Sequence, residues 1–303
     1  MVFMSFSSDV KTELCKQPIS DKMCAAGECL GILLYGNTFS KTGIKIITES
    51  RPFAKRLTKL FRASFGFEPE LQSEKTDSGK LIFTVTEHEK LNIIFDTYGY
   101  DRDKVFAHHI NFGVLEDDGT RRSFVRGAFL AGGSVTDPEK RYHLELVTDH
   151  YSVSREACSI LQELGFEPKL TDRSGHYIIY FKQSAAIEDL LTTMGAPVAA
   201  MTLMNARIEK NMTNSVNRRV NCDTANVTRT VEASQNQLDA IRRLDAAGRL
   251  DALPPKLRET ARLRLDNPEL NLRELAEHTD PPVTKSCLNH RLRKLVELSA
   301  AIK

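Results

Sequence analysis

The feature that most constrains this chain is an internal repeat with a period of about 100 residues. The segment "IKIITES" from Ile44 has the same pattern as "LELVTDH" from Leu144, 100 residues later. The segment "GFEPEL" from Gly66 returns as "GFEPKL" from Gly165, 99 residues later. A third pair, "GILLYGN" and "GAFLAGG", precedes these two and is separated by 96 residues. Three landmarks in the same order predict a duplicated structural unit.

Each copy predicts the same order of elements: a helix, two strands, a helix, two strands and a last helix. In the second copy we expect them at residues 122–132, 134–136 with 142–148, 152–164, 167–170 with 177–181, and 185–194. The first helix of each copy, here called the motif helix, has small residues at equivalent positions, Gly31 and Gly127. Small residues let two helix backbones approach closely, so we expect the copies to pack about a pseudo-twofold axis through these helices. The predicted fold class is α+β, with a duplicated αββαββα domain.

The composition of the chain changes after Met201. At 303 residues the chain has the length of about two domains. We expect a duplicated domain at 1–200, with repeats at about 20–100 and 120–196, and an all-α domain at 231–303. Residues 201–230 form a basic, asparagine-rich connector, which we interpret as a solvated helix and loop. The alternative is that it contacts phosphates, and Arg218 and Arg219 are then its candidate DNA-binding residues.

The all-α domain contains a helix-turn-helix pattern near its end. Two apolar runs at helical spacing, Leu272 to Ala276 and Leu288 to Leu295, flank a break at Asp280 to Pro282. On the last helix, polar and basic side chains lie opposite or beside the leucines. The candidate DNA-binding residues of this helix are Lys285, Ser286, Asn289, His290, Arg291, Arg293 and Lys294.

These residue types fit a helix that reads the major groove of double-stranded DNA. Asparagine can bond adenine through two hydrogen bonds, and arginine or lysine can reach guanine or a phosphate. Between Val283 and Val296 the sequence contains no acidic residue that would repel DNA. The alternative is an ordinary amphipathic helix with a solvated basic face, and the tight break before the helix favours DNA binding.

Several segments together resemble one family of bacterial regulators. They are "FVRGAFLAGGSV", the repeated "GFEP", "NSVNRRVNCDTANVTRTV" and "LAEHTDPPVTKSCLNHRLRKL", and they cover nearly the whole chain. The duplicated part resembles the LAGLIDADG homing-endonuclease fold, and with the tail attached the chain resembles the WhiA family. The resemblance implies a sequence-specific DNA-binding transcription regulator, linked to cell division and chromosome segregation, and in some bacteria to sporulation.

The resemblance also identifies two positions that decide whether the chain could cut DNA. In the endonucleases an acid near the end of each motif helix holds the divalent ions needed for hydrolysis. Here those positions are Gly36 and Gly132, so we expect no catalytic residue, no bound metal and no cofactor. Glu28 and Asp137 have no matching acid in the other repeat. The alternatives are an active LAGLIDADG-type endonuclease, or a regulator whose duplicated domain binds a protein or a small effector.

Other candidate sites are weaker. His108 and His109, or His143 and His150 with Asp149, could be interpreted as metal or acid–base sites, but histidines around strands are more often structural or surface residues. Loops for nucleotide phosphates and a nucleophile elbow are absent from the sequence. The six cysteines lack metal-ligand spacing, and no apolar run predicts a signal peptide or a membrane span. We therefore expect free thiols in a soluble, cytoplasmic and nucleoid-associated protein.

Overall fold

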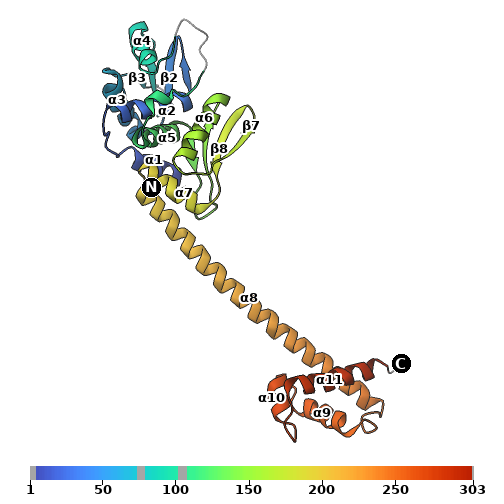
Figure 1. Ribbon diagram of the computed structural model, residues 1–303. Coiled ribbons are helices and arrows are strands. Elements are labelled where there is room, and N and C mark those ends of the chain that lie inside the picture. The colour runs from blue at the N-terminus through green and yellow to red at the C-terminus, as the bar shows by residue number, and fades with distance from the viewer. Residues whose placement is uncertain (1–4, 74–78, 102–107, 302–303) are drawn as a thin grey trace. The chain divides into compact units, whose positions relative to one another are not determined.

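The computed structural model describes residues 5–73, 79–101 and 108–301 (Figure 1). The short stretches between these ranges belong to the predicted duplicated domain and lie outside the described residues. The chain divides into two compact units, Met1–Lys210 and Asn211–Lys303. We call them the duplicated unit and the helical unit, and each is described by itself.

The duplicated unit contains the same seven elements twice, after a short first helix α1 (Phe6–Leu14). In the first repeat they are α2 (Lys22–Tyr35), β1 (Thr38–Ser40), β2 (Gly43–Thr48), α3 (Arg51–Phe65), β3 (Glu70–Ser73), β4 (Leu81–Val85) and α4 (His88–Thr97). A single 3-10 turn (Phe112–Val114) precedes the second repeat in the described chain. Its elements are α5 (Asp118–Gly132), β5 (Gly133–Val135), β6 (Leu144–Thr148), α6 (Tyr151–Glu163), β7 (Lys169–Arg173), β8 (His176–Phe181) and α7 (Ser184–Met194). The predicted order of elements and the α+β fold class are confirmed.

The two sheets repeat one topology. The strand orders are β1-β2-β4-β3 and β5-β6-β8-β7, and all neighbouring strands are antiparallel. The pairing register is also repeated, since Ile46 lies opposite Phe83 and its counterpart Leu146 lies opposite Ile179. All four of these side chains are buried. A shift of one residue would expose such side chains, so burial fixes the same register in both sheets.

The two motif helices, α2 and α5, pack against each other through their glycines (Figure 1). A Cβ atom placed on Gly31 would lie 2.2 Å from the carbonyl oxygen of Phe124. At the symmetric position, a Cβ on Gly127 would lie 2.0 Å from the carbonyl oxygen of Glu28. Real contacts of this kind are longer, so only glycine permits this approach. The reciprocal pair of contacts confirms that the repeats pack about a pseudo-twofold axis through the motif helices.

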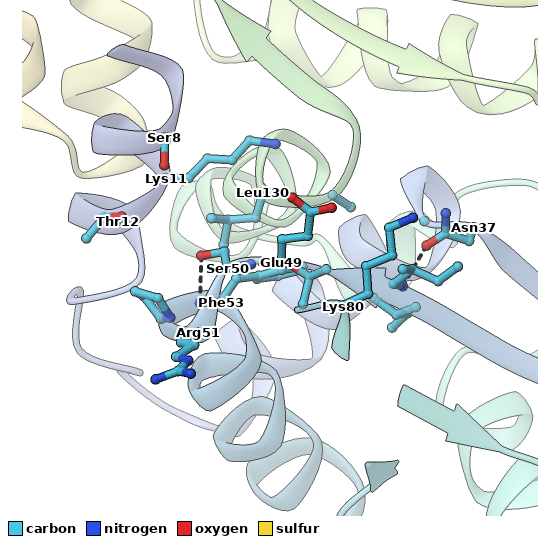
Figure 2. Close-up of a pocket in the computed structure, with 16 residues that line it drawn as sticks. Ser8, Lys11, Thr12, Asn37, Glu49, Ser50, Arg51, Phe53, Lys80 and Leu130 are labelled. Carbon is cyan, nitrogen blue, oxygen red and sulfur yellow. Dashed lines mark hydrogen bonds between the residues drawn. The ribbon is translucent and has the colours of Figure 1, made fainter. Parts of the chain in front are cut away.

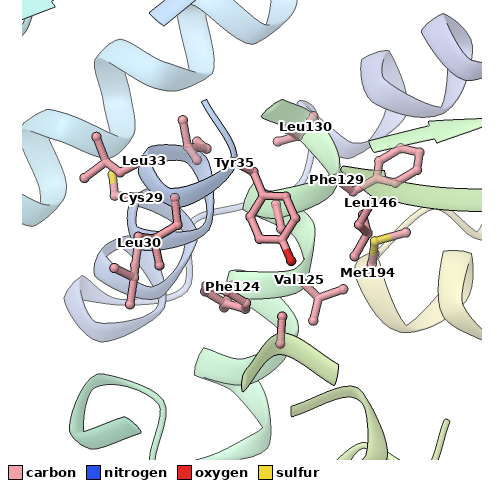
Figure 3. Close-up of a cluster of buried hydrophobic side chains, with 14 of the residues drawn as sticks. Cys29, Leu30, Leu33, Tyr35, Phe124, Val125, Phe129, Leu130, Leu146 and Met194 are labelled. Atoms are coloured by element: carbon pink, nitrogen blue, oxygen red, sulfur yellow. The ribbon is translucent and has the colours of Figure 1, made fainter. Parts of the chain in front are cut away.

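Apolar side chains fill the space around this helix crossing. Figure 3 shows the ring of Tyr35, from the end of α2, pointing toward Phe124 and Val125 of α5. The centroids of the Tyr35 and Phe124 rings lie 6.5 Å apart in an edge-to-face arrangement, which suits the charge distribution of aromatic rings. Residues of both repeats belong to one continuous hydrophobic core. The two repeats therefore form a single folding unit.

The second motif helix begins earlier than the apolar pattern predicts. We expected residue 122 as its start, whereas α5 begins at Asp118. The side chain of Asp117 accepts a hydrogen bond from the backbone N–H of Thr120 at 2.8 Å, and the Thr120 hydroxyl bonds back to Asp117. This capping box satisfies backbone N–H groups at the start of the helix. The first turn has few apolar residues, so the apolar spacing did not indicate it.

One long helix, α8 (Pro197–Ala246, 50 residues), follows the second repeat. We expected a helix and a loop at 201–230, ahead of the all-α domain at 231–303, and this expectation of a loop is wrong. The sequence contains no glycine or proline between Pro197 and Gly248, so nothing breaks the helix. In the described part of the chain, no helix is both long and apolar enough to cross a bilayer.

The helical unit is completed by α9 (Pro255–Asp266), α10 (Leu272–Glu277) and α11 (Lys285–Ala300). Its core includes Ile241 and Leu244 from the end of α8 together with Ala261 of α9. The apolar positions predicted for the last two helices belong to the same core, with Leu272 only partly buried. These buried residues are Leu275, Ala276, Leu288, Leu292 and Leu295. The predicted helix, break and helix are therefore confirmed.

Candidate nucleic-acid interface

Helix α11 is held against the helical unit by its leucines, and its first half carries most of the predicted DNA-contacting residues. Leu288, Leu292 and Leu295 are fully buried. The helix begins after Thr284, whose hydroxyl accepts a hydrogen bond from the backbone N–H of Cys287 at 3.2 Å. This cap fixes where the helix starts, and the buried leucines fix its rotation about its own axis. The position of every outer side chain follows from these two constraints.

Five of the predicted residues are exposed on the first half of α11. Helical geometry places Ser286, Asn289, His290 and Arg293 on the side away from the leucines, and each is exposed. Lys285, at the first position of the helix, is exposed beside them on the leucine side. No ion pair joins any of them to another residue of the described chain. The five residues are Lys285, Ser286, Asn289, His290 and Arg293. We call this surface the α11 face.

The other two predicted residues of this helix lie elsewhere. Lys294 is at the edge of the α11 face, and its Nζ lies 3.3 Å from a carboxylate oxygen of Glu297. Arg291 is only half exposed, because it lies beside Leu288 and Leu292 on the buried side of the helix. Its position between these leucines was readable from the sequence. Lys294 therefore borders the α11 face, and Arg291 does not belong to it.

The turn before α11 is tightly bonded. The hydroxyl of Thr279, which is 5% exposed, donates to the carbonyl oxygens of Ala276 at 2.9 Å and Pro281 at 3.1 Å. The backbone N–H of Val283 also donates to Ala276, at 3.2 Å. At the start of α10, Asn271 and Glu274 form a capping box. These bonds satisfy the polar groups of the turn and hold α10 and α11 in a fixed relation.

The middle of α8 presents a second polar surface. Every residue from 211 to 233 is exposed. Helical spacing places Asn214, Arg218 and Asn221 on one face, whereas Arg219 lies on a different side of the helix. The two asparagines were missed in the sequence because we interpreted this segment partly as loop. Their spacing of three and four residues around Arg218 was the available signal.

Two other basic residues of the connector are engaged within the duplicated unit. An Nη atom of Arg207 lies 2.9 Å from a carboxylate oxygen of Glu188. The Nζ of Lys210 donates to the carbonyl oxygen of Pro138 at 2.6 Å and lies 5.0 Å from the centre of the Tyr142 ring. These contacts hold the first turns of α8 in the duplicated unit. Arg218 and Arg219 make no ion pair with a described residue.

The ends of the motif helices leave little room for acidic side chains. A Cβ on Gly132 would lie 2.5 Å from the carbonyl oxygen of Val147, and one on Gly36 would lie 2.7 Å from that of Ile32. Either substitution would require the backbone to move. Among the residues that the structure describes, no group of three or more His, Cys, Asp or Glu side chains is arranged to hold a metal ion.

Glu28 is the acidic residue inside the first motif helix, and its carboxylate is fully engaged. It is 2% exposed and pairs with Arg56 through both oxygens, with Nη2 of Arg56 at 2.7 Å. Nη1 of Arg126, from the second motif helix, lies 3.2 Å from the same carboxylate. Burial lowers the pKa of Arg126, and the nearby Glu28 charge opposes that shift. Glu28 therefore pairs with two arginines, one from each repeat, and joins the repeats.

The histidines found in the sequence do not form one cluster. The rings of His108 and His150 stack with their centroids 3.7 Å apart. Burial lowers the pKa of both rings. His143 instead lies beside Glu145, with 3.2 Å between Nε2 and a carboxylate oxygen. Asp149 pairs with His176, which the sequence did not single out. These contacts do not bring His143, His150 and Asp149 together.

Two family models match the chain in the order in which the units occur. The model described as the WhiA LAGLIDADG-like domain matches residues 121–213, and the model described as the WhiA C-terminal HTH domain matches residues 216–299. A protein of Ruminiclostridium cellulolyticum named "Probable cell division protein WhiA" is 38% identical, and the alignment covers 99% of this chain and 98% of that protein. The chain belongs to the WhiA family.

Other members of the family support the same fold. A Clostridium acetobutylicum protein with the same name is 36% identical over 99% of both chains. The crystal structure of full-length WhiA from Thermatoga maritima aligns with 98% of this chain and 98% of that chain, with a TM-score of 0.61 and 24% sequence identity. The WhiA architecture of a LAGLIDADG-like domain followed by a helix-turn-helix domain is thus the architecture of this chain.

Proposed function

We propose that this WhiA-family chain is a sequence-specific regulator of transcription that binds double-stranded DNA through α11. The observation that carries the proposal is the α11 face: five exposed polar or basic residues, on a stretch of sequence without an acidic residue, in a helix fixed by its cap and its core. A rigid helix that exposes amide and basic groups suits recognition of base edges in the major groove.

The residues of the α11 face have different proposed roles. The first turns of a recognition helix usually face bases, so Ser286, Asn289 and His290 are assigned to base contacts. Arg293 and Lys294, further along, are assigned to phosphates, and Lys285 to a phosphate or a guanine. Arg291, half buried beside the leucines, is the weakest of the sequence candidates.

The polar surface of α8 supports additional contacts with the DNA backbone. Arg218 and Arg219 are exposed, and Asn214 and Asn221 flank Arg218 on its face of the helix. Such groups bind phosphates without reading sequence, so they add affinity rather than preference.

The duplicated unit is proposed to act as a platform without nuclease activity. The lack of space at Gly36 and Gly132 and the full engagement of Glu28 support this proposal. The names of the relatives support a role in cell division, and we extend the proposal to chromosome segregation, to sporulation in some bacteria and to association with the nucleoid.

The test begins with genome-wide mapping of the DNA bound by the full chain. A duplex with a mapped site should bind more tightly than random duplex, with or without a chelator, and should stay intact in Mg²⁺ or Mn²⁺. Metal-dependent cleavage that is lost in Asp137→Ala would establish the endonuclease alternative. Equal binding of mapped and random duplexes would refute sequence-specific regulation.

A further inference from the structure

A hollow of about 720 Å³ lies between the first half of α3 and the segment that joins α1 to α2. Half of the residues that line it are basic, and none of the lining residues in the described chain is acidic. One of them, Arg56, is paired with Glu28. The other four make no ion pair with a described residue. We call these four the α3 cations: Lys16, Arg51, Lys55 and Lys59.

The α3 cations are concentrated on one stripe. Arg51, Lys55 and Lys59 follow each other at intervals of four residues, so they lie on one face of α3, and Lys16 comes from the segment across the hollow. Arg51 also borders a neighbouring hollow of about 700 Å³. Figure 2 shows its guanidinium turned away from Lys11 and Glu49 of that second hollow.

The second repeat provides an internal comparison. Helix α6 keeps the buried apolar face of α3, but Tyr151 and Ser159 replace Arg51 and Lys59 at equivalent positions. Of the three α3 cations that lie on the helix itself, only the middle one has a basic counterpart, Arg155. The buried counterparts are Phe53 and Val153, Leu57 and Ala157, Leu60 and Ile160, and Phe61 and Leu161. The fold therefore requires the apolar face and does not require the cations.

The floor of the hollow is rigid. Arg56 is 3% exposed, and its Nη1 donates to the carbonyl oxygens of Gln17 at 2.6 Å and Cys15 at 3.3 Å. Its other nitrogens are held by Glu28. Arg56 thereby fixes the segment that carries Lys16 in front of α3. A ligand would meet a wall that is already in place, which lowers the entropic cost of binding.

Four cations around one hollow repel each other, and a multivalent anion relieves that repulsion. Lysine and arginine both bind phosphate groups well, and the hollow lies at the start of a 15-residue helix whose dipole also favours negative charge. The volume falls within the range of about 300 to 1,000 Å³ that is typical of small-molecule sites. We propose that this hollow binds a small molecule that carries two or more linked phosphate groups.

The experiment is calorimetric titration of the full chain with tripolyphosphate at about 0.15 M salt, where weak surface attraction is screened. The wild-type chain should bind one molecule, and pyrophosphate should bind more tightly than inorganic phosphate. The double variant Lys55→Gln with Lys59→Gln should bind tripolyphosphate at least roughly tenfold more weakly, because it loses two charge-assisted contacts. Both lysines are exposed, so the variant should keep its fold.

The matched control is Arg155→Gln with Lys169→Gln, which removes two exposed cations from the second repeat. It should bind tripolyphosphate as the wild type does. The proposal is wrong if both double variants lose affinity equally, if inorganic phosphate binds as tightly as tripolyphosphate, or if the wild type shows no binding. A short random duplex that binds in this hollow, and loses affinity only in the Lys55 and Lys59 variant, would instead assign it to DNA. These outcomes are independent of whether α11 reads sequence.

Discussion

Where the motif helices cross, Glu28 and Arg126 pair within the packed interior, whereas the basic side chains of α11 are mostly exposed and mostly without a partner. Glu28 of α2 binds Arg56 and Arg126 in the interior of the duplicated unit. On α11, Lys285 and Arg293 are exposed and pair with no described residue. Charges of the first kind hold a fold together, and charges of the second kind remain available to a partner. The difference supports a structural role for the pair at the motif helices and the proposed recognition role for α11.

The largest expected effect concerns the buried pair. Glu28→Ala leaves the buried guanidinium of Arg56 and the partly buried guanidinium of Arg126 without their carboxylate, which should lower the free energy of unfolding by about 3–5 kcal/mol. Denaturant unfolding of the full chain measures this loss. Glu28→Gln, which keeps the shape and one acceptor, should lose less. A loss below about 1 kcal/mol for Glu28→Ala would show that the carboxylate is not the structural link that its contacts indicate.

The second expected effect concerns reading by the α11 face. Asn289→Ala should weaken binding to the best DNA site by about 1–3 kcal/mol and change binding to random DNA little, because only a base contact distinguishes sequences. Asn289 is exposed, so its replacement should leave stability within about 0.5 kcal/mol of the wild type. Competition binding with both duplexes gives the specificity ratio. An unchanged ratio would remove Asn289 from the reading surface.

The smallest expected effect separates anchoring from reading. Arg293→Ala should weaken binding to specific and random DNA alike. If Arg293 meets one phosphate, the plot of log affinity against log salt should also flatten by about one unit, because one fewer counterion is released. Arg262→Ala removes the same charge from α9, where Asp251 already pairs with it, and should leave the slope unchanged. Equal slopes for Arg293→Ala and the wild type would argue against the phosphate contact.

Much of the fold could be predicted from the sequence, because apolar spacing reports which face of an element is buried. The repeated landmarks located both motif helices, and the leucines of α11 located its exposed face. The continuity of α8 was missed because asparagine-rich composition favours loops only weakly, whereas the lack of glycine and proline was decisive.

The partners of charged residues could not be predicted in the same way. Glu28 meets Arg56 and Arg126, which lie 28 and 98 residues away in the sequence, and only the folded packing brings them together. The hollow beside α3 was missed for a similar reason, since Lys16 belongs to a segment outside the repeated elements. The other basic residues of the hollow, the stripe from Arg51 to Lys59, could be recognised in the sequence by their helical spacing.

The most direct test of the account compares the DNA preference of the two compact units. Fragments 1–210 and 211–303 follow the division of the structure, and circular dichroism would first verify that each is folded. Competition binding should show that fragment 211–303 prefers the mapped site over random duplex. Its affinity should be lower than that of the full chain if the duplicated unit raises the effective concentration of contacts. Fragment 1–210 should show no preference, and the account is contradicted if that fragment carries the sequence preference while fragment 211–303 has none.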